Sequence, residues 1–93
     1  MSAIDLGATP GLAARTRLQV DPVTGEQVLL YPEGVLVLND TARDIVERCN
    51  GSRTLAEILE SLASEYEASI DELRPDVMEC IAQLVERNLL VLK

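Results

Sequence analysis

The chain is 93 residues long and carries 16 Asp or Glu residues against eight Lys or Arg, which gives a net charge of −8. A chain of this length folds as one domain with a single small core, and its negative charge disfavours binding to nucleic acids or anionic membranes, because both depend on Lys and Arg. With two Cys, no His, no signal peptide and no apolar run of roughly 18 residues, we expect no metal site, no membrane span and a reducing cytoplasmic environment.

The N-terminal third of the chain predicts a tail followed by a β-hairpin. Residues 1–10 show no hydrophobic period and are expected to form a flexible tail, which leaves residues 11–93 as the single folded domain. Residues 15–20 alternate polar and apolar side chains, which is typical of a half-buried strand. The turn formers of residues 21–25 separate it from a second strand at residues 26–31, so we expect these two strands to pair.

A short apolar run at residues 35–38 predicts a third strand. It follows the turn formers Pro32 and Gly34, and it contains the β-branched Val35 and Val37. Because the whole run is apolar, the strand is either central in the sheet or an edge that something must cover. Three occupants of such an edge are open: a partner peptide added as a fourth strand, a second copy of the chain, or residues 89–92.

Helix one is expected to begin at Asn39 or Asp40. Side-chain oxygens in this segment can accept hydrogen bonds from the free N–H groups of the first turn. Gly51 tolerates a positive φ and is expected to end the helix. Apolar residues at helical spacing mark its buried stripe: Ala42, Ile45, Val46 and Cys49.

Two more helices follow. Thr54 and Glu57 have the spacing of a capping box that opens helix two. Its expected buried stripe is Leu55, Ile58, Leu59, Leu62 and Tyr66. Helix three has three candidate caps, Ser69, Asp71 and Glu72, and Asn88 can close it in the left-handed conformation. Its expected inner stripe is Val77, Cys80, Ile81, Leu84 and Val85, and residues 89–92 form either a short strand or a packed tail.

Three N-terminal antiparallel strands followed by three helices predict a small α+β domain. Helices two and three would form a helix-turn-helix-like pair, with the hairpin as its wing. A winged-helix DNA-binding regulator is therefore the alternative function, but its third helix would have to present Lys and Arg to DNA. Acidic residues outnumber basic ones on that helix: Glu72, Asp76, Glu79 and Glu86 against Arg74 and Arg87.

No residue pattern indicates catalysis. Cys49 and Cys80 lie on apolar stripes and are expected to be small buried hydrophobes, since the chain has no His to activate a thiol. The spacing of the carboxylates selects no acid–base pair. We expect them on solvated helix faces, with an acidic surface that steers a basic segment of a partner as the functional alternative.

The turn between strands two and three belongs to a longer pattern. Its residues are Leu29-Leu30-Tyr31-Pro32-Glu33-Gly34, Leu38-Asn39, Thr41-Ala42, Cys49-Asn50-Gly51 and Arg53-Thr54. Less specific matches extend it over about residues 10–92: Pro10, Leu12, Arg17-Leu18, Asp21, Asp76-Val77 and Leu84. Together these segments resemble the pyrroloquinoline quinone biosynthesis protein D family (PqqD), which more often has Asp at the position of Asn50.

The resemblance implies a cytoplasmic peptide chaperone that is not an enzyme and needs no cofactor. Such a protein binds the precursor peptide PqqA and presents it to the radical S-adenosylmethionine enzyme PqqE, whose iron–sulfur clusters belong to that enzyme. It also implies a groove between strand three and helix three. The expected peptide-binding residues are Val35, Leu36, Val37, Leu38, Asp76, Val77, Cys80, Gln83, Leu84 and Arg87. A homodimer formed through the same strand edge is a further alternative.

Overall fold

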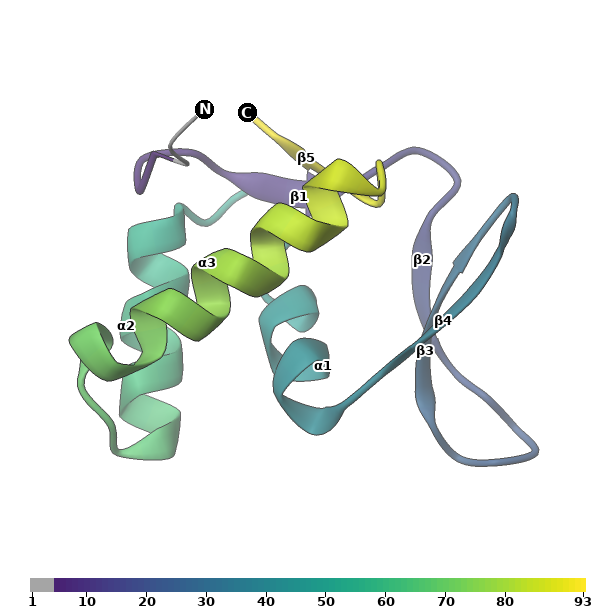
Figure 1. Ribbon diagram of the computed structural model, residues 1–93, viewed down its shortest axis with the longest axis horizontal. Coiled ribbons are helices and arrows are strands. Elements are labelled where there is room, and N and C mark those ends of the chain that lie inside the picture. Colours follow the sequence, from purple (N-terminus) through teal and green to yellow (C-terminus); the bar gives the residue numbers. More distant parts are fainter. Residues whose placement is uncertain (1–4) are drawn as a thin grey trace.

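Three helices lie on one side of a three-stranded antiparallel sheet in the computed structural model, which describes residues 5–93 (Figure 1). A second, two-stranded sheet joins the two ends of the described chain. Along the chain the elements are β1 (Pro10–Leu12), β2 (Arg17–Val20), β3 (Gln27–Tyr31), β4 (Gly34–Leu38), α1 (Asp40–Glu47), α2 (Leu55–Tyr66), α3 (Ile70–Glu86) and β5 (Leu90–Leu92).

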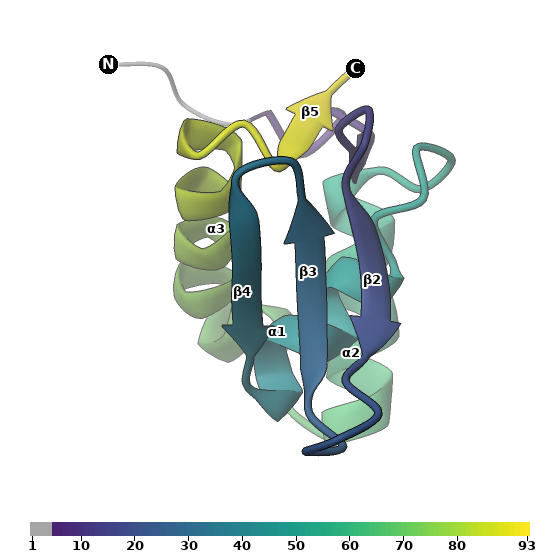
Figure 2. The same cartoon turned by 90° about the vertical axis from the view of Figure 1, so that its right-hand side faces the viewer.

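The larger sheet has the strand order β2-β3-β4, so β4 is an edge strand (Figure 2). The turn at Pro32 and Glu33 joins β3 to β4, and it places Tyr31 directly opposite Gly34. In Figure 2, β4 lies on the α3 side of the sheet and β2 lies at the other edge. The three predicted strands are confirmed, with β2 and β3 beginning one or two residues later than expected.

The second sheet was not predicted as such. β1 pairs with β5 in antiparallel register, with Gly11 opposite Val91, so residues 90–92 form a strand and not a packed tail. They cover β1, and within residues 5–93 no strand covers the free edge of β4. The two partners are separated by nearly the whole chain, and a three-residue strand carries too few residues to show an alternating pattern.

Residues just before β1 are hydrogen-bonded to the rest of the fold. The carbonyl of Ala8 accepts from Leu55 N at 2.9 Å, and Thr9 N donates to the Lys93 carbonyl at 3.1 Å. Residues 1–4 of the expected tail lie outside the described residues. The division into a tail of residues 1–10 and a domain of residues 11–93 therefore stays a prediction, although the backbone from Leu6 onwards already bonds to α2.

Side-chain caps define the starts of all three helices. Asn39, Thr54 and Ser69 accept hydrogen bonds from backbone N–H groups of the first turns of α1, α2 and α3. Ser69 forms a complete capping box with Glu72, which decides among the three candidate starts of α3. Asn88 has a φ of 63° after α3, in the left-handed conformation expected of it.

Helix α1 ends at Glu47, earlier than expected from Gly51. Gly51 still has a φ of 79°, but it lies in the loop before α2, where its N–H donates to the Pro10 carbonyl at 2.9 Å. A Cβ on Gly11 would lie 3.3 Å from the Gly51 backbone. These two glycines therefore allow β1 to approach the loop after α1 closely.

The core lies among the three helices, the inner face of the larger sheet and the segment of Leu89 and Leu90, and it consists almost entirely of aliphatic side chains. Each buried Leu, Ile or Val contributes roughly 1.5–3 kcal/mol relative to an exposed one. The clustered core residues are Leu29, Leu38, Ile45, Val46, Cys49, Leu55, Ile58, Leu59, Leu62, Val77, Ile81, Leu84, Leu89 and Leu90.

Tyr66, expected in the stripe of α2, is 39% exposed. Its hydroxyl donates to the buried carboxylate of Asp44, which raises the pKa of Tyr66 to about 12.

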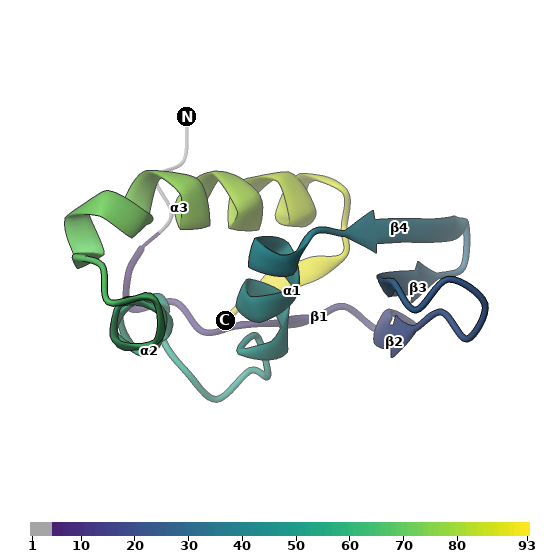
Figure 3. The same ribbon diagram turned by 90° about the horizontal axis from the view of Figure 1, so that it is seen from below.

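No helix or strand within residues 5–93 covers the outer face of the larger sheet (Figure 3). Val35 and Val37 project from β4 on this face and are 56% and 54% exposed. The alternate residue Leu38 points to the helices and is buried. The predicted apolar run thus divides into an inner and an outer row, as the period of a strand requires.

Candidate functional site: an open strand edge beside a groove

The free edge of β4 is the first component of the candidate site. Tyr31 and Gly34 flank a two-residue turn, and in such a hairpin the closing pair is the one that exchanges hydrogen bonds. Hydrogen-bonded and non-hydrogen-bonded pairs then alternate along an antiparallel ladder. Leu36 and Leu38 therefore direct their backbone N–H and C=O groups to β3, whereas those of Val35 and Val37 point to the open edge.

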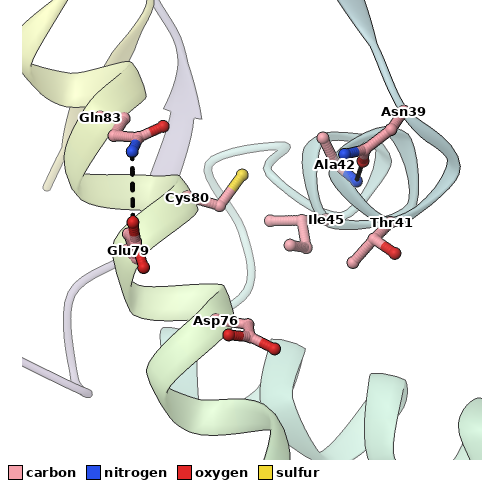
Figure 4. A pocket seen from close by; sticks show the side chains of 8 residues that line it. All are labelled: Asn39, Thr41, Ala42, Ile45, Asp76, Glu79, Cys80 and Gln83. Atoms are coloured by element: carbon pink, nitrogen blue, oxygen red, sulfur yellow. Dashed lines mark hydrogen bonds between the residues drawn. The ribbon is translucent and has the colours of Figure 1, made fainter.

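A cavity of about 380 Å³ between the start of α1 and the middle of α3 is the second component (Figure 4). Because β4 runs into α1 with only Asn39 between them, the cavity begins where the strand ends. Helix α3 contributes side chains at helical spacing on its other side. The lining residues are Asn39, Thr41, Ala42, Ile45, Asp76, Glu79, Cys80 and Gln83.

The cavity has an apolar base and a polar rim. Ile45 is 1% exposed, Cys80 is half-buried, and in Figure 4 the Cys80 sulfur points across the cavity towards Ile45. Asp76 and Glu79 are exposed on the rim. The Gln83 side-chain amide donates to Glu79 Oε1 at 3.4 Å, which is a long hydrogen bond.

Both thiols have a pKa above the ordinary value of a cysteine. Burial raises the pKa of Cys80, and burial together with the nearby Cys80 raises the pKa of Cys49 to about 12. The Cys49 thiol donates to the Ile45 carbonyl at 3.2 Å. Thiolate chemistry is therefore suppressed at these positions, which act as small apolar side chains.

The structure brings together some of the expected site residues and separates others. Asp76, Cys80 and Gln83 line the cavity. Val77 and Leu84 are 1% and 4% exposed and have their side chains in the core behind α3. Arg87 lies beyond the end of α3. It lines a hollow of about 520 Å³ beside the turn at Pro32 and Glu33, and it shares another of about 530 Å³ with Gln83 and Glu86.

Five lining residues were not expected from the sequence. Four come from the start of α1, and Glu79 comes from α3; the four are Asn39, Thr41, Ala42 and Ile45. A usable signal was present, because a strand that runs directly into a helix must place the start of that helix at the end of the strand edge. For Glu79, the helical spacing from Asp76 to Gln83 was the signal.

The family model for coenzyme PQQ synthesis protein D (PqqD) matches residues 26–90, from β3 into β5. The chain belongs to the PqqD family. A protein of Xanthomonas campestris pv. campestris strain B100 named PqqA binding protein is 40% identical over 97% of this chain and 98% of its own length. A protein of the same name from Xanthomonas oryzae pv. oryzae strain PXO99A is 39% identical over the same shares.

Two solved PqqD structures resemble the chain. One is the solution structure of the PqqD part of Methylobacterium extorquens PqqCD, with a TM-score of 0.81 at 28% identity, covering 96% of this chain and 95% of that one. That protein is described as a functional, stand-alone recognition element for ribosomally synthesised, post-translationally modified peptides. The crystal structure of Xanthomonas campestris PqqD has a TM-score of 0.55 at 38% identity, covering 94% and 98%.

The PqqD sequence motif has mainly structural roles in this chain. Gly34 closes the turn between β3 and β4, Asn39 caps α1, and Thr54 caps α2. Gly51 has the positive φ that glycine tolerates best. The motif therefore holds β4 and α1 in place beside the groove, and it also supplies four of the eight residues that line the groove: Asn39, Thr41, Ala42 and Asp76.

Among residues 5–93 there is no group of three or more His, Cys, Asp or Glu side chains placed to hold a metal ion. None of the helices in this part of the chain is long and apolar enough to cross a membrane.

Proposed function

We propose that this protein is a peptide chaperone of pyrroloquinoline quinone biosynthesis that binds the precursor peptide PqqA. The observation that carries the proposal is the open edge of β4 at the mouth of the groove between α1 and α3. An extended peptide can add to such an edge as a fourth strand, with main-chain hydrogen bonds supplying affinity and side-chain pockets supplying specificity. The name PqqA binding protein of its relatives supports this choice of peptide.

In the proposed complex the peptide pairs with the outward backbone groups of Val35 and Val37. Side chains of an added strand alternate between the two faces of the sheet. One row enters the groove beside Asp76, Cys80 and Gln83, and the other continues the exposed apolar face of Val35 and Val37. The strand and the helix are supported from the core by Leu36, Leu38, Val77 and Leu84. Arg87 lines the end of the site that lies beside the turn at Pro32 and Glu33.

The bound peptide is then presented to the radical S-adenosylmethionine enzyme PqqE in the cytoplasm, and the chaperone itself catalyses no reaction. A binding role is consistent with the names of the relatives and with two thiols whose pKa is raised by burial. The exposed strand edge could alternatively pair with that of a second copy. Peptide and second copy would compete for the same backbone groups.

The alternative of a DNA-binding winged helix receives no support from the surface of α3. Its exposed residues include Asp71, Glu72, Asp76, Glu79 and Glu86, against Arg74. Carboxylates on a helix in the major groove would face phosphates of like charge.

A heteronuclear NMR titration tests the proposed function. Synthetic PqqA of Xanthomonas campestris is added to the ¹⁵N-labelled protein, and we expect the largest shifts at the amides of Val35 and Val37 and along the outer side of α3. A scrambled peptide of the same composition is the control. Equal shifts with both peptides, or shifts confined to β2 and α2, would contradict the proposal.

A further inference from the structure

We propose that the pocket between α1 and α3 binds a Lys or Arg side chain of the captured peptide. This inference rests on the proposed function and adds the chemistry of one side chain to it. The pocket holds about 380 Å³, enough for one long side chain with its solvent. Its apolar base and acidic rim match the two parts of such a side chain, an aliphatic stem and a cationic head.

The charges around the pocket are of one sign. Among its eight lining residues are two carboxylates, Asp76 and Glu79, and no Lys or Arg. Among residues 5–93 the salt bridges are Arg43 with Asp44 and Glu47, and Arg48 with Glu65. Asp76 and Glu79 thus have no cationic partner in this part of the chain, and one supplied by a ligand would gain attraction from both.

The base of the pocket suits the stem of the same side chain. Ala42 and Ile45 of α1 face Cys80 of α3 (Figure 4). A long straight stem can contact this surface while its head stays at the wet rim, so the charge is not buried. An acidic side chain would instead bring a third carboxylate to the rim, and a purely apolar one would leave both carboxylates without a cationic partner.

The N-terminus of α1 disfavours a cation in the pocket, but more weakly than the two carboxylates favour one. A helix N-terminus carries roughly half a positive charge and favours anions. Asp40 lies in the first turn of α1, and Asn39 already accepts a hydrogen bond from Ala42 N at 2.7 Å. These groups offset the partial charge, whereas Asp76 and Glu79 each carry a full one.

Strand geometry indicates which peptide residue enters the pocket. Residues directly opposite each other in an antiparallel pair have side chains on the same face of the sheet. Leu38 points its side chain to the helix side, and the next residue, Asn39, lines the pocket. The peptide residue opposite Leu38 is therefore the one whose side chain projects towards Asp76 and Glu79.

Calorimetric titration of synthetic Xanthomonas campestris PqqA tests this inference. Each Lys and Arg of the peptide is replaced singly by Gln, and the protein is used as wild type, Asp76→Asn, Glu79→Gln and the double variant. We expect each carboxylate variant to weaken binding about twofold to fivefold. At one peptide position, replacement by Gln should make the affinity insensitive to the carboxylate substitutions. With the unmodified peptide, the affinity difference between wild-type protein and the carboxylate variants should shrink in about 0.5 M salt.

Glu60→Gln serves as the matched control, because Glu60 is exposed on α2 and lines none of the pockets described. It changes the net charge equally and should leave affinity unchanged. A Glu79→Lys protein should recover affinity for the peptide that carries Glu at the critical position. If the double variant binds wild-type peptide as tightly as the wild-type protein does, the charge inference is overturned but strand addition stands. Failure of wild-type protein to bind PqqA overturns the proposed function and this inference with it.

Discussion

Tyr31 lies directly opposite Gly34 across the turn formed by Pro32 and Glu33, and this pair sets the hydrogen-bond parity of the hairpin. Because the pair closes a two-residue turn, the backbone groups of Val35 and Val37 point away from β3. The same parity places the side chains of these valines on the exposed face of the sheet. Both consequences can be tested by placing the same substitution at adjacent positions of β4.

A proline scan of β4 should separate folding from binding. Val37→Pro removes an N–H that points to the open edge, so we expect a loss of about 1 kcal/mol in the free energy of unfolding from φ strain and a complete loss of PqqA binding. Leu36→Pro removes an N–H bonded to β3 and a packed side chain, and should cost about 3 kcal/mol or more. Thermal melts and peptide titrations are measured in parallel, with Leu36→Ala as control. Equal destabilisation by proline at residues 35, 36 and 37 would exclude strand addition.

A bulkier side chain at Cys80 should fill the groove. Cys80 is half-buried beside a cavity of about 380 Å³, so Cys80→Leu has room to fold and should change stability by less than about 1.5 kcal/mol. We expect PqqA affinity to fall by about tenfold, which corresponds to 1.4 kcal/mol of lost contacts. Ala82→Leu, at an exposed position on the same helix, is the control. If Cys80→Leu alters neither affinity nor stability, the peptide lies elsewhere.

Alkaline pH should destabilise the protein through Cys49. Its folded-state pKa is about 12 because of burial, whereas an unfolded thiol titrates near 8.5. Below about pH 8.5 both states hold the proton. Above it the unfolded state loses the proton first, so the free energy of unfolding falls by up to about 1.4 kcal/mol per pH unit until the folded thiol ionises.

Urea unfolding at about pH 8 and pH 10 should therefore show a larger loss for wild type than for Cys49→Ala. The variant also loses packing, but that loss is independent of pH. Cys80 and Tyr66, whose pKa values are also raised, titrate in both proteins and cancel from the comparison. Parallel pH dependence of the two proteins would show that Cys49 is not the responsible group.

DNA binding should be negligible near physiological salt. The net charge is −8, and the exposed side of α3 is mainly acidic. Electrophoretic mobility shifts with random duplexes at about 0.15 M salt are expected to show no complex. Detection of a sequence-specific complex whose affinity falls steeply with salt would restore the winged-helix regulator as the leading function.

The sequence alone was sufficient for most of the local elements of this protein, with β1 and the end of α1 as exceptions. The hairpin, the capping box of Thr54 with Glu57 and most of the buried stripes of the helices depend on residues within a few positions of one another. The second capping box, Ser69 with Glu72, was one of three candidate starts until the structure selected it. The resemblance to PqqD rests on local features of the same kind, because its motif combines turn and cap residues such as Gly34 and Asn39 with neighbouring core residues such as Leu38. The order of β2, β3, β4 and the three helices follows from these local signals.

Only the tertiary structure decided which surfaces are open. Residues 90–92 pair with β1 and not with β4, and no local pattern encodes this choice because each of the two edges lies more than fifty residues away in the sequence. The rotation of α3 turns Val77 and Leu84 into the core and leaves Asp76 and Cys80 at the groove. The start of α1 completes the pocket because β4 runs straight into it. A groove is a space between elements, and packing distant parts of the chain together is what creates it.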